Sequence, residues 1–201
     1  MALNSNALIT LALAKSFLKI PTAETSQDAF IEHCINAFSD LFEGETDRKI
    51  KEVSVTEYHD GRKSNMITLG EYPVNEITSV KIDSTSRFSG SETTLDSSTY
   101  AIGDNNNALY YNTHFPSGFR NIKVVYKAGY TTIPSDIQNA ALWGVFYYFN
   151  MRETKDIGRT SKGKGDESIN ILQELPLEVV NCINRHRRLE VPNTTRQASY
   201  E

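Results

Sequence analysis

Cysteine is scarce in this sequence. The 201 residues contain two cysteines, Cys34 and Cys182, and neither belongs to a Cys-x-x-Cys pair. A disulfide framework is therefore not expected, and assembly in a reducing compartment fits this composition. We expect both cysteines to be small, buried apolar residues on helices.

Long apolar runs are lacking as well. Residues 8–13 are apolar enough for the core of a signal peptide, but no basic segment precedes them, and Lys15 and Lys19 interrupt the run. An amphipathic helix is the better interpretation. Since no segment approaches the roughly 20 apolar residues that span a bilayer, we expect a soluble protein with no membrane partner.

Residues with the spacing of a catalytic or metal site are few. The four histidines stand at positions 33, 59, 114 and 186, and we find no pair at metal-ligand spacing and no clustered Cys/His site. His33 and Cys34 are neighbours on a predicted helix, so their side chains point in different directions. Asp60 lies beside His59, but an Asp-Gly turn explains it better than an acid–base pair does. We therefore predict no catalytic residue, metal or cofactor, and a protein that is not an enzyme.

A strong excess of positive charge is also missing. The 21 lysines and arginines are outnumbered by 25 aspartates and glutamates, which argues against a protein whose whole surface binds nucleic acid. The local exception is a glycine-rich segment, 158–165, with the cations Arg159, Lys162 and Lys164. It lacks the residue order of a phosphate-binding loop. We predict a flexible loop over 154–168 and favour a solvated linker, with contact to DNA in a channel as the functional alternative.

Helical periodicity is present at the start of the chain. Thr10 can cap a first helix, which Pro21 stops. Thr25 or Ser26 can cap a second, broadly apolar helix, and Gly44 is expected to end it.

Two more helices are predicted near the other end. The pattern Ser135-x-x-Gln138 is a capping box, and the helix over 137–151 is apolar or aromatic around nearly its whole circumference. Such a helix needs cover on several sides, from its own domain or from neighbouring subunits. A last helix begins near Pro176 and ends in a basic cluster formed by Arg185, Arg187 and Arg188. These cations stabilise the end of the helix, but three exceed that need and also suggest a surface facing a partner or DNA.

Between the helices the apolar period changes to that of strands. A strand from Val53 leads to Asp60-Gly61, a hairpin turn signal, with Ile67 and Leu69 on the return strand. Further strands are predicted at 72–82, 100–102, 109–111 and 122–126, with a polar loop at 83–98 and a second turn at 103–107. Because no crossover helices lie between them, the strands should form an antiparallel sheet.

The predicted fold class is α+β: a small bundle of about four helices with an inserted antiparallel β subdomain and an extended C-terminal tail. We assign the helical core to 1–48 and 131–189, the β subdomain to 49–130, the flexible loop to 154–168 and the docking tail to 190–201. The tail has no core-forming pattern, so a partner or a neighbouring subunit is expected to hold it.

Several landmarks follow one another in a recognisable order between residues 8 and 188. They include Leu69-x-x-Tyr72-Pro73-Val74, then Val125-Tyr126-x-Ala128-Gly129-Tyr130-x-x-Ile133-Pro134-x-Asp136-Ile137, the aromatic run, and Leu175-Pro176-x-x-Val179. Each is weak singly, but their shared order resembles the head–tail connector family (adaptor or head-completion proteins) of long-tailed bacteriophages.

The resemblance implies a structural virion protein that forms a ring, usually of twelve copies, below the portal. Such a ring connects the DNA-filled head to the tail and extends the DNA channel. The implied partners are the portal protein, neighbouring copies in the ring, the next neck or tail-completion protein and, without sequence specificity, the packaged DNA. The implied location is the neck of the virion, assembled in the host cytoplasm. Family members commonly engage the portal with their C-terminal segment, which here gives the docking residues Leu189, Val191, Pro192, Arg196 and Tyr200.

Two other functions stay open. A tail-completion or stopper-type neck protein would contact the tail tube instead of the portal. A binding module on the β subdomain would expose aromatic side chains on its sheet.

Overall fold

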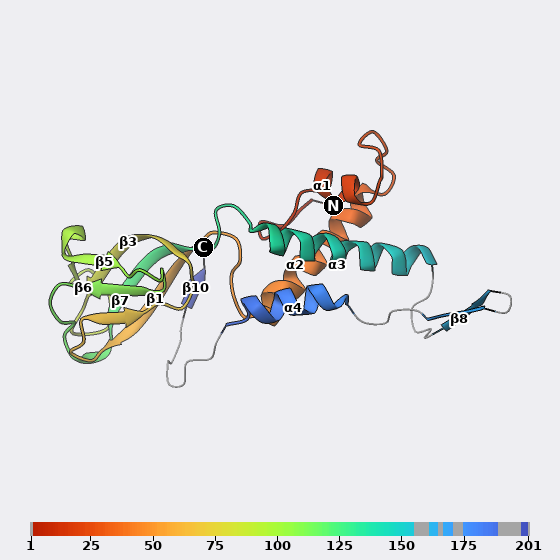
Figure 1. The fold of residues 1–201 in the computed structure, drawn as a ribbon. Coiled ribbons are helices and arrows are strands. Elements are labelled where there is room, and N and C mark those ends of the chain that lie inside the picture. Colours follow the sequence, from red (N-terminus) through yellow and green to blue (C-terminus); the bar gives the residue numbers. More distant parts are fainter. Residues whose placement is uncertain (1, 155–160, 165–166, 171–174, 189–197, 201) are drawn as a thin grey trace. The chain divides into compact units, whose positions relative to one another are not determined.

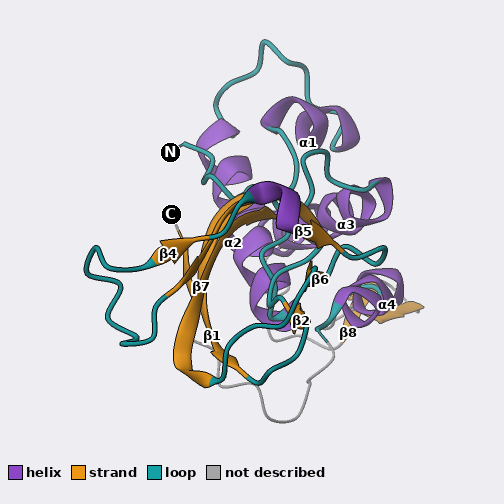
Figure 2. Ribbon diagram, turned by 90° about the vertical axis from the view of Figure 1, so that its left-hand side faces the viewer, coloured by secondary structure: helices purple, strands orange, loops and turns teal. Residues whose placement is uncertain are grey.

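The computed structural model describes residues 2–154, 161–164, 167–170, 175–188 and 198–200. The chain divides into two compact units, each of which is treated by itself. The helical unit comprises residues 1–50 and 132–188, and the sheet unit comprises 51–131 and 189–201. Figure 2 distinguishes their helices from their strands.

Helix α1 (Leu11–Phe17) opens the helical unit, and the predicted cap is confirmed because Thr10 Oγ1 accepts a hydrogen bond from Leu13 N at 3.2 Å. Its most informative side chain is Lys15, which is only 3% exposed. The buried ammonium donates to Asp28 Oδ1 at 2.7 Å and to the carbonyl of Thr22 at 3.1 Å. A buried cation needs such partners, so Lys15 ties α1 to the beginning of the next helix.

Helix α2 (Asp28–Thr46) differs from the prediction at both ends. It begins after Gln27, which makes no side-chain cap, so neither Thr25 nor Ser26 serves as the N-cap. At the other end it continues through Gly44, where a Cβ would meet no atom within 4 Å. The helix is ended by Asp47, whose backbone is left-handed with φ 50°. Aspartate tolerates this conformation better than most residues do.

Helix α3 (Ser135–Thr154) packs against α1, α2 and α4 (Leu177–His186), as Figure 1 shows. Its buried side is made of small and branched residues: Ile137, Ala140, Ala141 and Val145. Gly144 permits the closest approach, because a Cβ there would lie 2.0 Å from the ring of Phe38 on α2. The predicted capping box differs in detail, since the Gln138 side chain donates to Ile133 O at 2.8 Å.

The described residues of the sheet unit form two antiparallel sheets. The larger has the order β10-β1-β7-β3-β4 and the smaller has the order β2-β6-β5. The strands of the larger sheet are β1 (Val53–Gly61), β3 (Val74–Ile82), β4 (Thr93–Thr94), β7 (Gly118–Ala128) and β10 (Ala198–Tyr200). Those of the smaller are β2 (Met66–Thr68), β5 (Tyr100–Ile102) and β6 (Ala108–Tyr111), and a short 3-10 helix, Ser97–Thr99, precedes β5. The predicted turn at 103–107 joins β5 to β6, which pair as expected.

The predicted hairpin turn at Asp60-Gly61 is wrong. Both residues belong to β1, and the strand that follows, β2, pairs with β6 and not with β1. Gly61 has a different purpose, because a Cβ there would lie 1.7 Å from the carbonyl oxygen of Pro116. A close backbone approach thus explains this glycine.

The segment expected to be a loop over 154–168 contains regular structure in its described part. Strands β8 (Ser161–Lys164) and β9 (Glu167–Asn170) form a two-stranded antiparallel ladder. In the sequence they are separated by Gly-Asp, a dipeptide favoured in two-residue hairpin connections. The predicted fold class is nevertheless confirmed, because the part of the chain that the structure describes combines four helices with antiparallel sheets, as an α+β fold does.

Candidate functional site

An exposed aromatic cluster lies on the helical unit, where α1 and α3 meet. We call Phe17, Trp143 and Phe146 the aromatic cluster. Phe17 contacts Trp143 and Phe146 edge-on, with ring centroids 5.5 and 6.1 Å apart. Trp143 and Phe146 are each 37% exposed and Leu13 is 36% exposed. The apolar side chains of α3 are therefore only partly buried within the helical unit.

The end of α4 is fixed to the end of α2 by the predicted basic cluster. Arg187 donates to the carbonyl of Glu45 at 2.9 Å and to its carboxylate at 2.8 Å. Arg188 donates its backbone N–H to Thr46 O at 2.9 Å, and its guanidinium lies 3.6 Å from Asp47 Oδ2. Cations near the last carbonyls of a helix stabilise them. Arg187 and Arg188 thus bind the end of α2 inside the helical unit.

The third arginine belongs to a compact group of ionisable side chains. Arg185 has a side chain that is 65% exposed, and its guanidinium lies 3.9 Å from Asp136 Oδ2 in the first turn of α3. His186 Nε2 is 2.9 Å from the same oxygen, and Cys182 Sγ is 3.6 Å from Asp136 O. The hydrogen bond from His186, opposed by partial burial, lowers the pKa of Asp136 below its usual value. The carboxylate is therefore ionised, and we call Asp136, Cys182 and His186 the α3–α4 triad.

Sequence reasoning misses the α3–α4 triad. Asp136 precedes the other two residues by more than forty positions, so only the packing of α3 on α4 brings the groups together. Only Cys182-x-x-x-His186 could have been noticed in the sequence as a possible pair, because residues four apart share one face of a helix.

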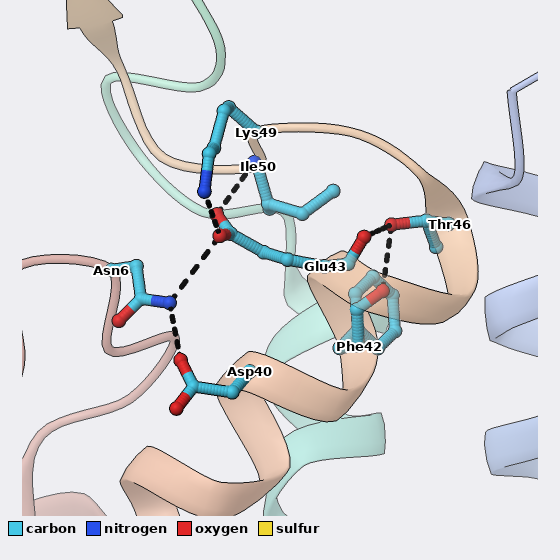
Figure 3. A network of polar contacts seen from close by, with 7 residues as sticks. All are labelled: Asn6, Asp40, Phe42, Glu43, Thr46, Lys49 and Ile50. Carbon is cyan, nitrogen blue, oxygen red and sulfur yellow. Dashed lines mark hydrogen bonds and ion pairs between the residues drawn. The ribbon is translucent and has the colours of Figure 1, made fainter. Parts of the chain in front are cut away.

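A buried carboxylate fixes the segment that leads out of the helical unit (Figure 3). Glu43 is 8% exposed, and its oxygens accept from Ile50 N at 3.2 Å, Lys49 Nζ at 2.9 Å and Asn6 Nδ2 at 3.3 Å. Asn6 also donates to Asp40 Oδ1 at 2.8 Å. A buried charge is tolerated when it is paired and hydrogen-bonded in this way. The network joins the N-terminal segment, α2 and the residues that follow it.

The predicted docking tail is described only in its last strand. Tyr200 lies opposite Val55 in the antiparallel pairing of β10 with β1. Leu189, Val191, Pro192 and Arg196 lie outside the described residues. Of the predicted channel loop, Lys162 and Lys164 belong to β8, while Arg159 lies outside the described residues.

The sheet unit holds its own polar centre, which the sequence does not reveal. Glu57 is 3% exposed and accepts from Tyr126 Oη at 2.9 Å and from Gly70 N at 3.1 Å. His59 Nε2 lies 3.0 Å from the same carboxylate. Burial, followed by the nearby charge of Glu57, raises the pKa of Tyr126, so its hydroxyl stays protonated and donates.

The residues that could serve nucleophilic catalysis are poorly placed for it. Burial raises the pKa of Cys34 to about 11 and also raises that of Cys182, so both thiols are protonated at neutral pH. His33 is exposed whereas Cys34 is buried. Asp60 accepts from the backbone of Arg120 at 2.7 Å and His59 contacts Glu57, so these neighbours do not pair with each other.

Comparison with known proteins gives a consistent result. The family model described as "Head completion protein" matches residues 7–189. The fold is similar to that of a chain from the "Neck of empty GTA particle computed with C6 symmetry", with TM-score 0.64, 17% identity, and coverage of 96% of both chains. A chain from the "Neck of native GTA particle computed with C12 symmetry" matches with TM-score 0.60 and 18% identity, covering 96% of this chain and 99% of that one.

No curated protein matches the sequence. Within the described part of the chain, no helix has the length and apolar character to cross a membrane. The resemblance drawn from the sequence landmarks is confirmed by the family match, which extends over nearly the whole chain. This chain belongs to the head completion protein family.

Proposed function

We propose that this protein is a structural subunit of the neck of a phage-like particle. In this proposal, copies form a ring of twelve below the portal, which connects the DNA-filled head to the tail and extends the DNA channel. The observation that carries the proposal is the match to the head completion family over residues 7–189. Family membership also favours a structural role over an enzymatic one.

The fold likeness supports a place in a symmetric neck. The similar chains come from necks of gene transfer agent particles computed with C6 and C12 symmetry. Both symmetries are compatible with a twelve-membered ring around a channel. A cyclic ring requires each subunit to present surfaces that its neighbours cover.

The aromatic cluster supports contact with a neighbouring protein. Trp143 and Phe146 are both more than one-third exposed, although their rings are in edge-on contact, with centroids 5.7 Å apart. Contiguous exposed apolar side chains are characteristic of interaction surfaces. Aromatic residues also contribute a large share of the binding energy at protein interfaces. In the proposed ring, a neighbouring copy covers this cluster.

The C-terminal segment is the proposed portal-docking element, with Leu189, Val191, Pro192, Arg196 and Tyr200 as its contacts. The pairing of β10 with β1 supports this role, because a terminal segment able to form a strand can add to the edge of a partner's sheet. Arg185 is the proposed partner-facing member of the basic cluster, since its side chain is 65% exposed. Arg159, Lys162 and Lys164 are the proposed contacts with DNA in the channel.

The proposal is tested by electron microscopy of the purified protein mixed with purified portal. We expect a twelvefold ring on one end of the portal. A variant lacking residues 190–201 should remain folded and should no longer join the portal. A variant with the same twelve residues in scrambled order is the matched control for chain length and composition, and we expect it to fail as well.

Two results would contradict parts of this proposal. Unchanged portal association after the truncation would exclude the docking role of the tail. A ring that binds purified tail tubes and does not bind portals would favour the tail-completion alternative. Thermal unfolding of each variant shows whether the sheet unit still folds without β10.

A further inference from the structure

The α3–α4 triad brings together a carboxylate, a thiol and an imidazole. One ligand atom from each of Asp136, Cys182 and His186 lies within 4.8 Å of the other two. Cys182 and His186 project from the same face of α4 because they are four residues apart. Asp136 reaches them from the first turn of α3, so the three groups come from two packed helices.

These ligand types select a particular kind of metal. Thiolate and imidazole ligands suit Zn²⁺ and similar transition metals, whereas Mg²⁺ and Ca²⁺ prefer sites made of oxygen. Zinc bonds of about 2.0–2.3 Å place neighbouring tetrahedral ligands roughly 3.3–3.8 Å apart. In the structure, His186 Nε2 and Asp136 Oδ2 are 2.9 Å apart, and the three ligand atoms all lie within 4.8 Å of one another. Shifts of about 1 Å would therefore bring them to the separations of a tetrahedral zinc site. Three protein ligands leave a fourth position for water or another ligand.

The residues around the α3–α4 triad restrain its side chains and leave one side of the triad accessible to solvent. Cys182 is 2% exposed and lies inside the unit, while the Asp136 side chain is 39% exposed and faces solvent. The His186 ring lies 6.4 Å from the ring of Phe42, and the Arg48 guanidinium donates to His186 O at 3.1 Å. Such contacts around a ligand limit its movement and thereby favour binding.

In this structure Asp136 is contacted by two neighbouring side chains. His186 Nε2 contacts Asp136 Oδ2 at 2.9 Å, and the Arg185 guanidinium lies 3.9 Å from the same oxygen. A metal ion would replace the His186 hydrogen bond and would be repelled by Arg185. Because the Arg185 side chain is 65% exposed, it can rotate into solvent at little cost.

We propose that Asp136, Cys182 and His186 bind a Zn²⁺ ion that links the beginning of α3 to the end of α4. Binding releases the thiol proton of Cys182 to solvent, since the thiolate is the ligand. This site is independent of the proposed neck function, and its test requires no assembly partner.

The experiment is a titration of the full-length, chelator-treated protein with Co²⁺, followed by absorption spectroscopy. We expect the visible bands of tetrahedral Co²⁺ and a thiolate-to-cobalt charge-transfer band, both saturating at one equivalent and removed by Zn²⁺. Zn²⁺ alone should raise the melting temperature. Cys182→Ser should abolish the charge-transfer band, and Cys34→Ser, which alters the other buried cysteine, should retain it.

A second variant is expected to strengthen metal binding instead of weakening it. Arg185→Gln removes a positive charge near the ligands. Because the exposed arginine can turn away from the metal, Co²⁺ binding should tighten by no more than about fivefold, the interaction of two unit charges about 4 Å apart in water. No charge-transfer band in the native protein would overturn the proposal. A band that persists in a folded Cys182→Ser protein, or weaker Co²⁺ binding by Arg185→Gln, would overturn it as well.

Discussion

The two units of this protein place their buried polar groups differently. In the helical unit the buried charged side chains lie near helix ends, where Lys15 pairs with Asp28 and Glu43 binds Lys49 and Ile50. In the sheet unit a charged group lies in the interior, where Glu57 is bound by Tyr126 and Gly70. The apolar residues around it include Val55 and Val124, both completely buried.

This difference indicates how each unit specifies its structure. Close packing is decisive in the helical unit, because α2 and α3 approach each other where Gly144 faces the ring of Phe38. Hydrogen bonding is decisive in the sheet unit, because a buried carboxylate is tolerated only where its donors are in position. Substitutions that change volume and substitutions that remove a donor should therefore affect the two units unequally.

The largest effect is expected from Gly144→Ala. The new Cβ would lie 2.0 Å from the fully buried ring of Phe38, so the α2–α3 contact must open. Overpacking of this kind should lower the free energy of unfolding by about 3 kcal/mol. Urea unfolding measures the loss, and hydrogen exchange should locate it in α2 and α3.

Gly44→Ala is the matched control, because it makes the same substitution within a helix. A Cβ at Gly44 meets no atom within 4 Å, and alanine favours the helix over glycine by about 0.5–1 kcal/mol. The control should therefore be slightly more stable than the native protein. Equal destabilisation by both substitutions would show that close packing at Gly144 is not the cause.

The next effect, in the sheet unit, is expected from Tyr126→Phe. The change removes the donor to Glu57 and the acceptor for the backbone N–H of Glu71, at 2.9 and 3.0 Å. Buried groups that lose a partner cost about 1–3 kcal/mol, and we expect a loss near the middle of that range. Hydrogen exchange should increase in β1 and β7 and stay unchanged in α2. Faster hydrogen exchange in α2 alone would contradict the assignment of this hydrogen-bond network to the sheet unit.

The smallest effect is expected from Asp83→Asn, at the beginning of the loop after β3. Backbone hydrogen bonds to Asp83, first from Thr85 and then from Phe88, lower the pKa of its carboxyl group. The stabilisation is therefore complete above the unfolded pKa of about 3.9 and is lost as the pH falls through the lower folded value. The substitution should lower the melting temperature at neutral pH but make little difference once the carboxyl group is protonated. If the two proteins still differed in melting temperature at acidic pH, the effect would come from the changed side-chain geometry and not from the lost charge.

Local sequence signals predicted the elements whose determinants are local. The apolar period located the helices, and Thr10 was correctly predicted to cap the first of them. The asparagine-rich segment at 103–107 was correctly predicted to be a turn between two paired strands. Errors occurred where distant residues decide the outcome. Gly61 resembles a turn glycine, but the carbonyl of Pro116 requires it, and β2 pairs with a strand some forty residues away.

The surfaces were less predictable than the fold. The apolar sequence of α3 indicated a need for cover, but only packing shows that Trp143 and Phe146 remain exposed beside Phe17. The α3–α4 triad likewise depends on the contact between two helices, so its members look unrelated along the chain. The order of landmarks was more informative, since it identified the family without any knowledge of these contacts.

The aromatic cluster has a spectroscopic consequence. Trp143 is the single tryptophan of the chain, and it lies in the exposed cluster with an accessible indole ring. Indole emission depends on the polarity of its surroundings, so burial by any neighbour would shift the colour of the emitted light. The protein therefore carries an intrinsic fluorescent reporter at the surface where a neighbouring copy is proposed to bind.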